Sequence, residues 1–133
     1  MKYILFAANV EEDIYVAMDE YLKAQNPVPS PYLVNGKLSE SAKRGKEIFA
    51  RECASCHSGK YYSDFKQYDV KWSQGADKGR KMDVPHLNEC WRTAPYLYDG
   101  RSATMQEMLK IHGPHNATSP QELQDLAEYV LSL

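Results

Sequence analysis

Apolar and polar residues alternate along the chain in patterns that predict four helices. The first helix is expected over Glu11–Ala24, where apolar side chains recur at helical spacing behind acidic residues that suit a helix N-terminus. The second is expected from Glu40 to about Ala54, following Ser39 as its N-cap. The segment 26–36 between them holds three prolines, which predicts an extended connector.

The second half of the chain places two shorter helices after a long polar stretch. Residues 60–103 show little periodicity and are rich in Tyr, Asp, Lys and Gly, which predicts a long irregular loop. Capping-box patterns begin at Thr104 and at Ser119. One helix is therefore expected from Thr104 to about His112, and another from Ser119 to the C-terminus. Because no sustained strand pattern appears, the predicted fold is mostly α, with few helices and long irregular loops.

Composition limits the classes of partner. The chain has 133 residues, a formal net charge of −2 and three cysteines. This length suits one domain with its own core. The near-neutral charge argues against a nucleic-acid partner. No membrane span is expected either, since no apolar run approaches the roughly 20 residues that a transmembrane helix needs.

One short motif carries the chemistry. Cys53, Cys56 and His57 form a C-x-x-C-H run, which is the attachment site of a c-type haem. Two thiols at this spacing reach the two vinyl groups of one porphyrin as thioethers, and the histidine follows as the proximal iron ligand. A thioredoxin-like redox pair would require a βαβ context and a zinc site a second ligand pair, and neither appears. The sequence therefore predicts one covalent haem c.

The residue on the opposite side of the iron separates an electron carrier from a catalyst. On the helix from Thr104, two methionines and His112 share one face, and His112 lies at the helix end beside Gly113. Methionines on such a face are often simply core residues. The residues alone leave these candidates open: Met82, Met105, Met108, His86, His112, His115 and Tyr98.

Three segments give the chain a family resemblance. Lys43–Phe49 before the haem motif, Val84–Leu87, and Trp91–Arg101 with its Pro-Tyr-Leu-x-Asp-Gly run are similar to the C-terminal haem domain of di-haem cytochrome c peroxidases and MauG-like proteins. The resemblance covers residues 38–133 and implies a cytochrome c-like domain around one haem. In that family the distal ligand stands where His112 falls, which implies an iron bound by both His57 and His112.

The resemblance also implies a domain organisation and a propionate partner. Residues 1–37 resemble the last helix of a preceding haem domain and its linker, so they are expected to form a leading unit before the domain at 38–133. Arg92 and Arg101 are each able to pair with a haem propionate through the guanidinium group. The resemblance favours Arg92 as the residue that pairs with the propionate. It also places Tyr98 where the family usually has histidine.

We therefore expect a mono-haem domain that transfers electrons through a bis-histidine iron. The alternative is a haem subunit, or one half, of a di-haem peroxidase or MauG-like oxidoreductase. The sequence holds no second C-x-x-C-H, so turnover by this chain alone is not expected. The expected partner is a redox protein or a second haem subunit, with a homo-oligomer as a further alternative. Because c-type haem is attached outside the cytoplasm, an exported, periplasmic protein is expected, although Tyr3–Val10 does not form a signal peptide.

Overall fold

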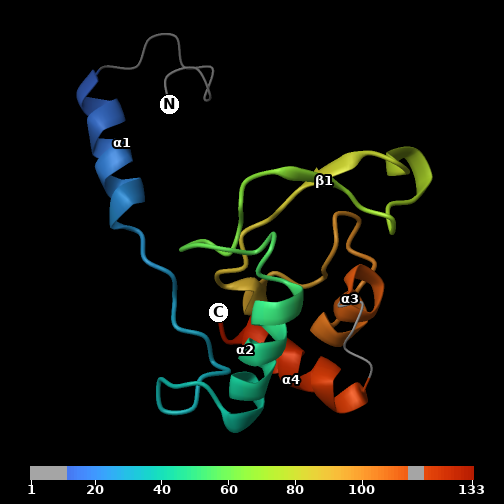
Figure 1. Ribbon diagram of the computed structural model, residues 1–133. Helices are drawn as coiled ribbons and strands as arrows, with labels where there is room; N and C mark the ends of the chain where they lie inside the picture. The colour runs from blue at the N-terminus through green and yellow to red at the C-terminus, as the bar shows by residue number, and fades with distance from the viewer. Residues whose placement is uncertain (1–11, 114–118) are drawn as a thin grey trace.

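The computed structural model describes residues 12–113 and 119–133 (Figure 1). Its helices are α1 (Glu12–Ala24), α2 (Glu40–Glu52), α3 (Met105–His112) and α4 (Pro120–Leu131). Between α2 and α3 lie four short elements: β1 (Gln67–Asp69), η1 (Gly75–Asp77), β2 (Lys81–Asp83) and η2 (Cys90–Arg92). Figure 1 shows α2, α3 and α4 gathered in one body, with α1 standing apart at the end of an extended segment.

The predicted helices and the mostly α fold class are confirmed, with two local differences. Helix α2 ends at Glu52, slightly earlier than expected, because Cys53 is its C-cap and the chain then turns. The expected loop at 60–103 contains a small antiparallel hairpin that pairs Tyr68 of β1 with Met82 of β2. Each of its strands has three residues, which is too short to give a recognisable alternating pattern.

All three predicted caps are present. The side chain of Ser39 accepts a hydrogen bond from a backbone N–H in the first turn of α2. Thr104 and Glu107 form a full capping box on α3, as Ser119 and Glu122 do on α4. These reciprocal bonds satisfy N–H groups that a helix N-terminus otherwise leaves without partners. The caps thus fix where α3 and α4 begin.

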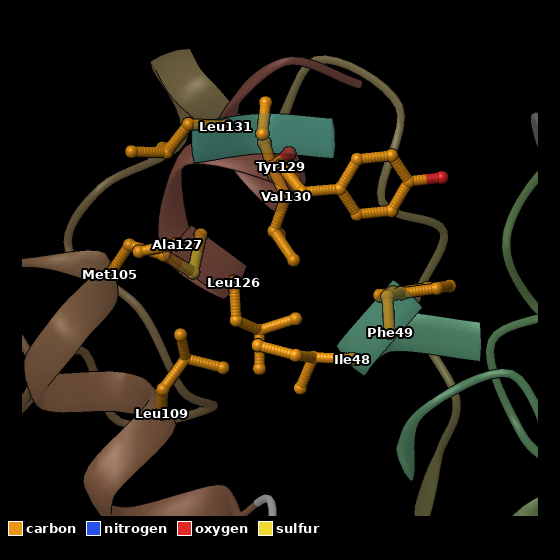
Figure 2. Packing of buried hydrophobic residues seen from close by; sticks show 11 residues of the cluster. Ile48, Phe49, Met105, Leu109, Leu126, Ala127, Tyr129, Val130 and Leu131 are labelled. Carbon is orange, nitrogen blue, oxygen red and sulfur yellow. The ribbon is translucent and has the colours of Figure 1, made fainter. Parts of the chain in front are cut away.

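The hydrophobic core lies where α4 packs against both α2 and α3 (Figure 2). In Figure 2, Phe49 of α2 lies beside Tyr129 of α4, and their ring centres are 5.2 Å apart. Leu126 of α4 is completely buried between the other helices. The core residues of α3 are Met105 and Leu109. Burial of this core is the main contribution to the stability of the folded protein, because it removes apolar side-chain surface from water.

Helices α2 and α4 lie very close together at Gly45. A Cβ atom at this position would lie 1.9 Å from the backbone oxygen of Asp125 and 2.9 Å from the Cβ of Tyr129. Real side-chain atoms do not occupy such distances, so this crossing requires glycine. The crossing in turn fixes the C-terminal end of α2, where the haem motif begins.

A polar cluster beside this crossing ties the same two helices together. Arg44 binds Asp125 in a bidentate pair, with nitrogen–oxygen distances of 2.6 and 2.8 Å. The hydroxyl of Ser41 donates to the same carboxylate at 2.6 Å. The hydrogen bond from Arg44 is the main reason that the pKa of Asp125 falls to about 2. Asp125 is therefore charged in the folded protein at any ordinary pH.

This cluster predicts how stability depends on pH. The carboxyl of Asp125 has a lower pKa folded than unfolded, where it is about 3.9. Its contribution is therefore fully present above pH 4 and is lost as pH falls from about 4 to about 2. At pH 7 we expect Asp125→Asn to lower the urea midpoint of unfolding. The difference in midpoint between the variant and the unaltered protein should become smaller as the pH falls from about 4 to about 2. Glu40→Gln, at an exposed pair with Lys43, is the control and should change the midpoint little.

Helix α1 contacts none of the other described helices or strands. Its exposed side chains include four large apolar or aromatic residues: Ile14, Val16, Tyr21 and Leu22. Among the described residues, no helix is long and apolar enough to cross a membrane. Whether 1–37 is a unit separate from 38–133 stays a prediction.

Candidate functional site

The C-terminal end of α2 delivers the predicted motif to a cavity. Cys53 caps the helix, and its carbonyl oxygen accepts the backbone N–H groups of Cys56 and His57 at 3.2 and 2.9 Å. This tight turn gathers both thiol-bearing residues and the imidazole at one place. All three residues line a cavity of about 770 Å³.

The cavity has the size and lining of a cofactor site. Its volume falls within the range of about 300–1,000 Å³ typical of ligand pockets. The hairpin, the segment around η2 and helix α3 supply walls that are mostly apolar. The apolar lining residues include Val70, Met82, Pro85, Leu87, Leu97, Met105, Met108 and Leu109. A large apolar porphyrin with two thiol-bearing residues at its edge fits this chamber.

The environment of Cys53 disfavours metal or redox chemistry at this thiol. Burial, and after it the negative charge of Glu52, raise the pKa of Cys53 to about 11. A metal-binding or redox-active thiol needs the opposite shift, because the thiolate is the reactive form. Within the described ranges, no group of three His, Cys, Asp or Glu residues is arranged to hold a metal ion. The alternatives of a zinc site or a dithiol pair therefore lose support.

His57 is prepared to bind iron through one nitrogen. Its Nδ1 lies 2.9 Å from the carbonyl oxygen of Tyr62, so Nδ1 carries the proton and donates. The lone pair is then on Nε2, the nitrogen left for a metal. Burial is the main cause that lowers the pKa of His57, which favours the neutral form that a ligand requires.

His112, the last residue of α3, lies close to His57. Their ring centres are 6.1 Å apart and their planes are inclined by 82°. An imidazole nitrogen binds a metal at about 2 Å and its ring centre lies about 1 Å beyond that nitrogen, so two imidazoles that held one ion from opposite sides would have their centres roughly 6 Å apart. The observed separation matches this requirement. The fold thus brings together two residues that are 55 positions apart in the sequence (112 − 57).

The other candidates for the distal position are distributed differently. Met82, Met108, His86 and Tyr98 line the same cavity. Met105 also lines it but packs into the core, with 3% of its surface exposed. His115 lies outside the described residues. Among the described candidates that have rings, His112 is the one whose ring contacts that of His57.

The residue that holds His112 was not predicted from the sequence. The indole Nε1 of Trp72 donates to Nδ1 of His112 at 3.0 Å. Trp72 also stacks on Tyr98, with ring centres 5.9 Å apart and planes inclined by 25°. Trp72 lies in the segment between β1 and η1, which has no periodic pattern. No spacing rule connects such a loop residue to a helix 40 positions away.

The two predicted propionate partners have other contacts. Arg92 pairs with Glu89 at 2.8 Å and is not among the residues that line the cavity. Its role at a propionate stays a prediction. Arg101 pairs with Asp99 at 2.6 Å and donates to the backbone oxygen of Trp72 at 2.7 Å. Arg101 therefore supports the segment that holds His112.

The third cysteine, Cys90, is buried at the cavity wall. Its thiol donates to the backbone oxygen of Val130 at 3.0 Å. Burial raises the pKa of Cys90 to about 12. This thiol is therefore neutral and unreactive in the folded chain.

Comparisons with known proteins identify the family and the fold. A family model described as cytochrome c matches residues 42–133. Hydrazine synthase subunit gamma of Kuenenia stuttgartiensis is 24% identical over an alignment of 165 residues, which covers 85% of this chain and 47% of that protein.

Two solved structures have a similar fold. A structure of Kuenenia stuttgartiensis hydrazine synthase pressurised with xenon has a TM-score of 0.73 at 24% identity, covering 94% of this chain and 56% of that chain. A MauG-like protein associated with microbial copper homeostasis has a TM-score of 0.69 at 19% identity, covering 96% and 58%. The chain thus spans about half the length of the relatives that it matches.

Proposed function

Because the chain belongs to the cytochrome c family and carries haem c bound covalently through Cys53 and Cys56, we propose that it passes single electrons through an iron bound by His57 and His112. Haem-based electron transfer with partner proteins is the general function of this family. The identity of the two axial ligands is the finer proposal. Its main support is the 6.1 Å separation of the two imidazole ring centres.

The residues of the chain have distinct roles in this function. The haem, when bound, supplies an iron that gains and loses one electron. The carbonyl of Tyr62 orients His57 and fixes the proton on its Nδ1. The apolar residues of the cavity exclude water, and a low-dielectric surrounding of this kind tunes the reduction potential.

Two imidazole ligands favour an electron carrier over a catalyst. A peroxidase needs an axial position where peroxide binds, with an acid–base group above it. If His57 and His112 both held the iron, no position on it would remain for a substrate. Histidine in place of methionine should also lower the reduction potential relative to a His/Met cytochrome.

Replacing His112 with alanine tests the ligand assignment. The oxidised holoprotein should have a low-spin optical spectrum, and His112→Ala should convert it to a high-spin spectrum. The reduced variant should also bind carbon monoxide readily, because one axial position becomes vacant. His86→Ala is the matched control, since His86 lines the same cavity and should leave the spectrum unaltered. A low-spin spectrum that survives in His112→Ala would contradict the assignment.

A second candidate function is that of a haem subunit that works beside another haem protein. The chain spans about half of its similar proteins, and α1 carries exposed apolar residues. We propose that residues 38–133 form the haem unit and that Arg92 pairs with a haem propionate. Residues 1–37 would join this unit to a second haem unit. The complex would be exported to the periplasm. Light scattering with haem analysis of the protein from its native source tests this. A monomer with one haem would contradict it.

A further inference from the structure

The aromatic loop, residues 60–66, follows the haem motif and exposes two aromatic side chains. Phe65 is 74% exposed, and its ring centre lies 6.1 Å from that of Tyr61, which is also exposed. The φ angle of Phe65 is 57°, a left-handed conformation that is costly for a bulky side chain. The hydroxyl of Ser63 accepts the backbone N–H of Phe65 at 3.0 Å and holds this turn in place. The fold thus keeps an apolar side chain in solvent at a cost in backbone energy, which indicates a contact surface.

Two lysines flank this aromatic pair. The amine of Lys60 lies over the ring of Tyr61, 5.3 Å from its centre, and the side chain of Lys66 is exposed. Asp64 is the one acidic residue of the segment, and its side chain is little exposed. The aromatic loop is therefore apolar at its centre and basic at its edges.

Helix α1 has a surface of the opposite charge. Ile14, Tyr21 and Leu22 recur at helical spacing, so they share one face, and all three are exposed. The helix carries four carboxylates and one lysine, which gives a formal charge of −3 (1 − 4). Glu12 and Asp19 lie seven positions apart, so they share the side of the helix next to Leu22. Helix α1 is thus apolar on one face and acidic beside it, which complements the aromatic loop.

The linker after α1 is fixed to the body of the protein. The backbone N–H of Val28 donates to the carboxylate of Glu89 at 2.8 Å. The hydroxyl of Ser30, which is buried, donates to the carbonyl of Leu131 at 2.5 Å. Prolines precede and follow Val28 in the sequence and restrict backbone rotation at this point. The linker therefore directs α1 away from its own body, as Figure 1 shows.

The linker and the aromatic loop are attached to the same short segment of the body. The backbone N–H of Leu87 donates to the carbonyl of Tyr61 at 3.3 Å, and Glu89, two residues later, binds Val28. A symmetric dimer pairs one patch of surface with the same patch on the other copy, so its contact elements must lie together. Helix α1 has 13 residues and is about 20 Å long, which allows it to extend onto a neighbouring molecule.

We propose that two copies of this chain form a dimer by exchanging α1, whose apolar and acidic surface packs on the aromatic loop of the other copy. This inference rests on the second candidate function, because the second haem unit is then another copy of this chain. The contact forms twice in each dimer and places Glu12 and Asp19 beside Lys60 and Lys66. It covers apolar side chains that each copy alone leaves in water.

Light scattering of the recombinant holoprotein tests this exchange. The unaltered protein should have twice the chain mass of 15.2 kDa, apart from its haem. A loop variant, Lys60→Glu with Lys66→Glu, and a helix variant, Glu12→Lys with Asp19→Lys, each bring like charges together at both contacts. One exposed ion pair changes an equilibrium by up to about fivefold, and four pairs are reversed in each dimer, so each variant should dimerise roughly tenfold more weakly or worse.

Mixing the two variants separates a lost contact from a misfolded chain. In the mixture the acidic helix of the loop variant meets the basic loop of the helix variant, and the second contact also joins opposite charges. Equimolar mixing should therefore restore the dimer, which misfolded chains do not do. Lys43→Glu with Lys46→Glu is the matched control, because it makes the same charge change at exposed positions of α2 and should leave the dimer intact.

A monomeric unaltered holoprotein would overturn the exchange of α1. A dimer that the loop and helix variants leave intact, or that mixing does not restore, would overturn it as well. Failure of the second candidate function is distinguishable, because the protein from its native source would then be a monomer with one haem. A native complex with a different haem protein would overturn the exchange and still support that function.

Discussion

Gly45→Ala is expected to lower the free energy of unfolding by about 2 kcal/mol or more. The new Cβ would lie 1.9 Å from a backbone oxygen of α4, so the two helices must separate. Forced overpacking of this kind costs about 1–3 kcal/mol or more, and contact with rigid backbone belongs at the high end. The better helix propensity of alanine offsets about 1 kcal/mol of that cost. Urea unfolding of the holoprotein, followed by far-UV circular dichroism, measures the net change.

Lys46→Ala is the control for this substitution. Lys46 is the next residue of α2 and is exposed, so its change should alter stability by less than about 0.5 kcal/mol. The Gly45 variant should also perturb the haem spectrum, since α2 carries the attachment motif at its end. Unaltered stability of Gly45→Ala would mean that α2 and α4 leave room for a methyl group at their crossing.

Local patterns in the sequence predicted the elements that local physics determines. The caps at Ser39, Thr104 and Ser119 and the periodic segments after them predicted α2, α3 and α4 nearly correctly, and apolar spacing behind acidic residues predicted α1. Each of these signals lies within one or two helical turns, so the local sequence is sufficient to predict that a helix forms and where it begins. The C-x-x-C-H motif predicted the cofactor for the same reason, because its chemistry depends on adjacent residues.

Contacts between distant segments were not predictable in this way. Gly45 carries no sequence signal for a helix crossing, because its role depends on a backbone oxygen 80 positions away (125 − 45). The hydrogen bond from Trp72 to His112 joins an irregular loop to a helix end and follows no periodicity. The proximity of His57 and His112 was expected only through a family resemblance, since spacing alone left several candidates open.

Covalent attachment of the haem and ligation of its iron depend on different residues. The thioether bonds of Cys53 and Cys56 hold the porphyrin, whereas in the proposed function the imidazoles of His57 and His112 determine the electronic state of the iron. These are different residues with different chemistry. Removing the two cysteines should therefore abolish covalent attachment and leave the spectrum that the two histidines produce.

The double variant Cys53→Ala, Cys56→Ala is expected to lose covalent haem almost completely. The haem of the unaltered protein should remain on the chain in a denaturing gel, and that of the variant should be extracted by acidified solvent, because only thioether bonds survive unfolding. Cys90→Ala is the matched control: its thiol lies at the same cavity but bonds to Val130. Under native conditions the double variant, reconstituted with haem, should keep a low-spin spectrum from His57 and His112. A high-spin spectrum would mean that the thioethers, rather than the fold, bring the iron between the two imidazoles.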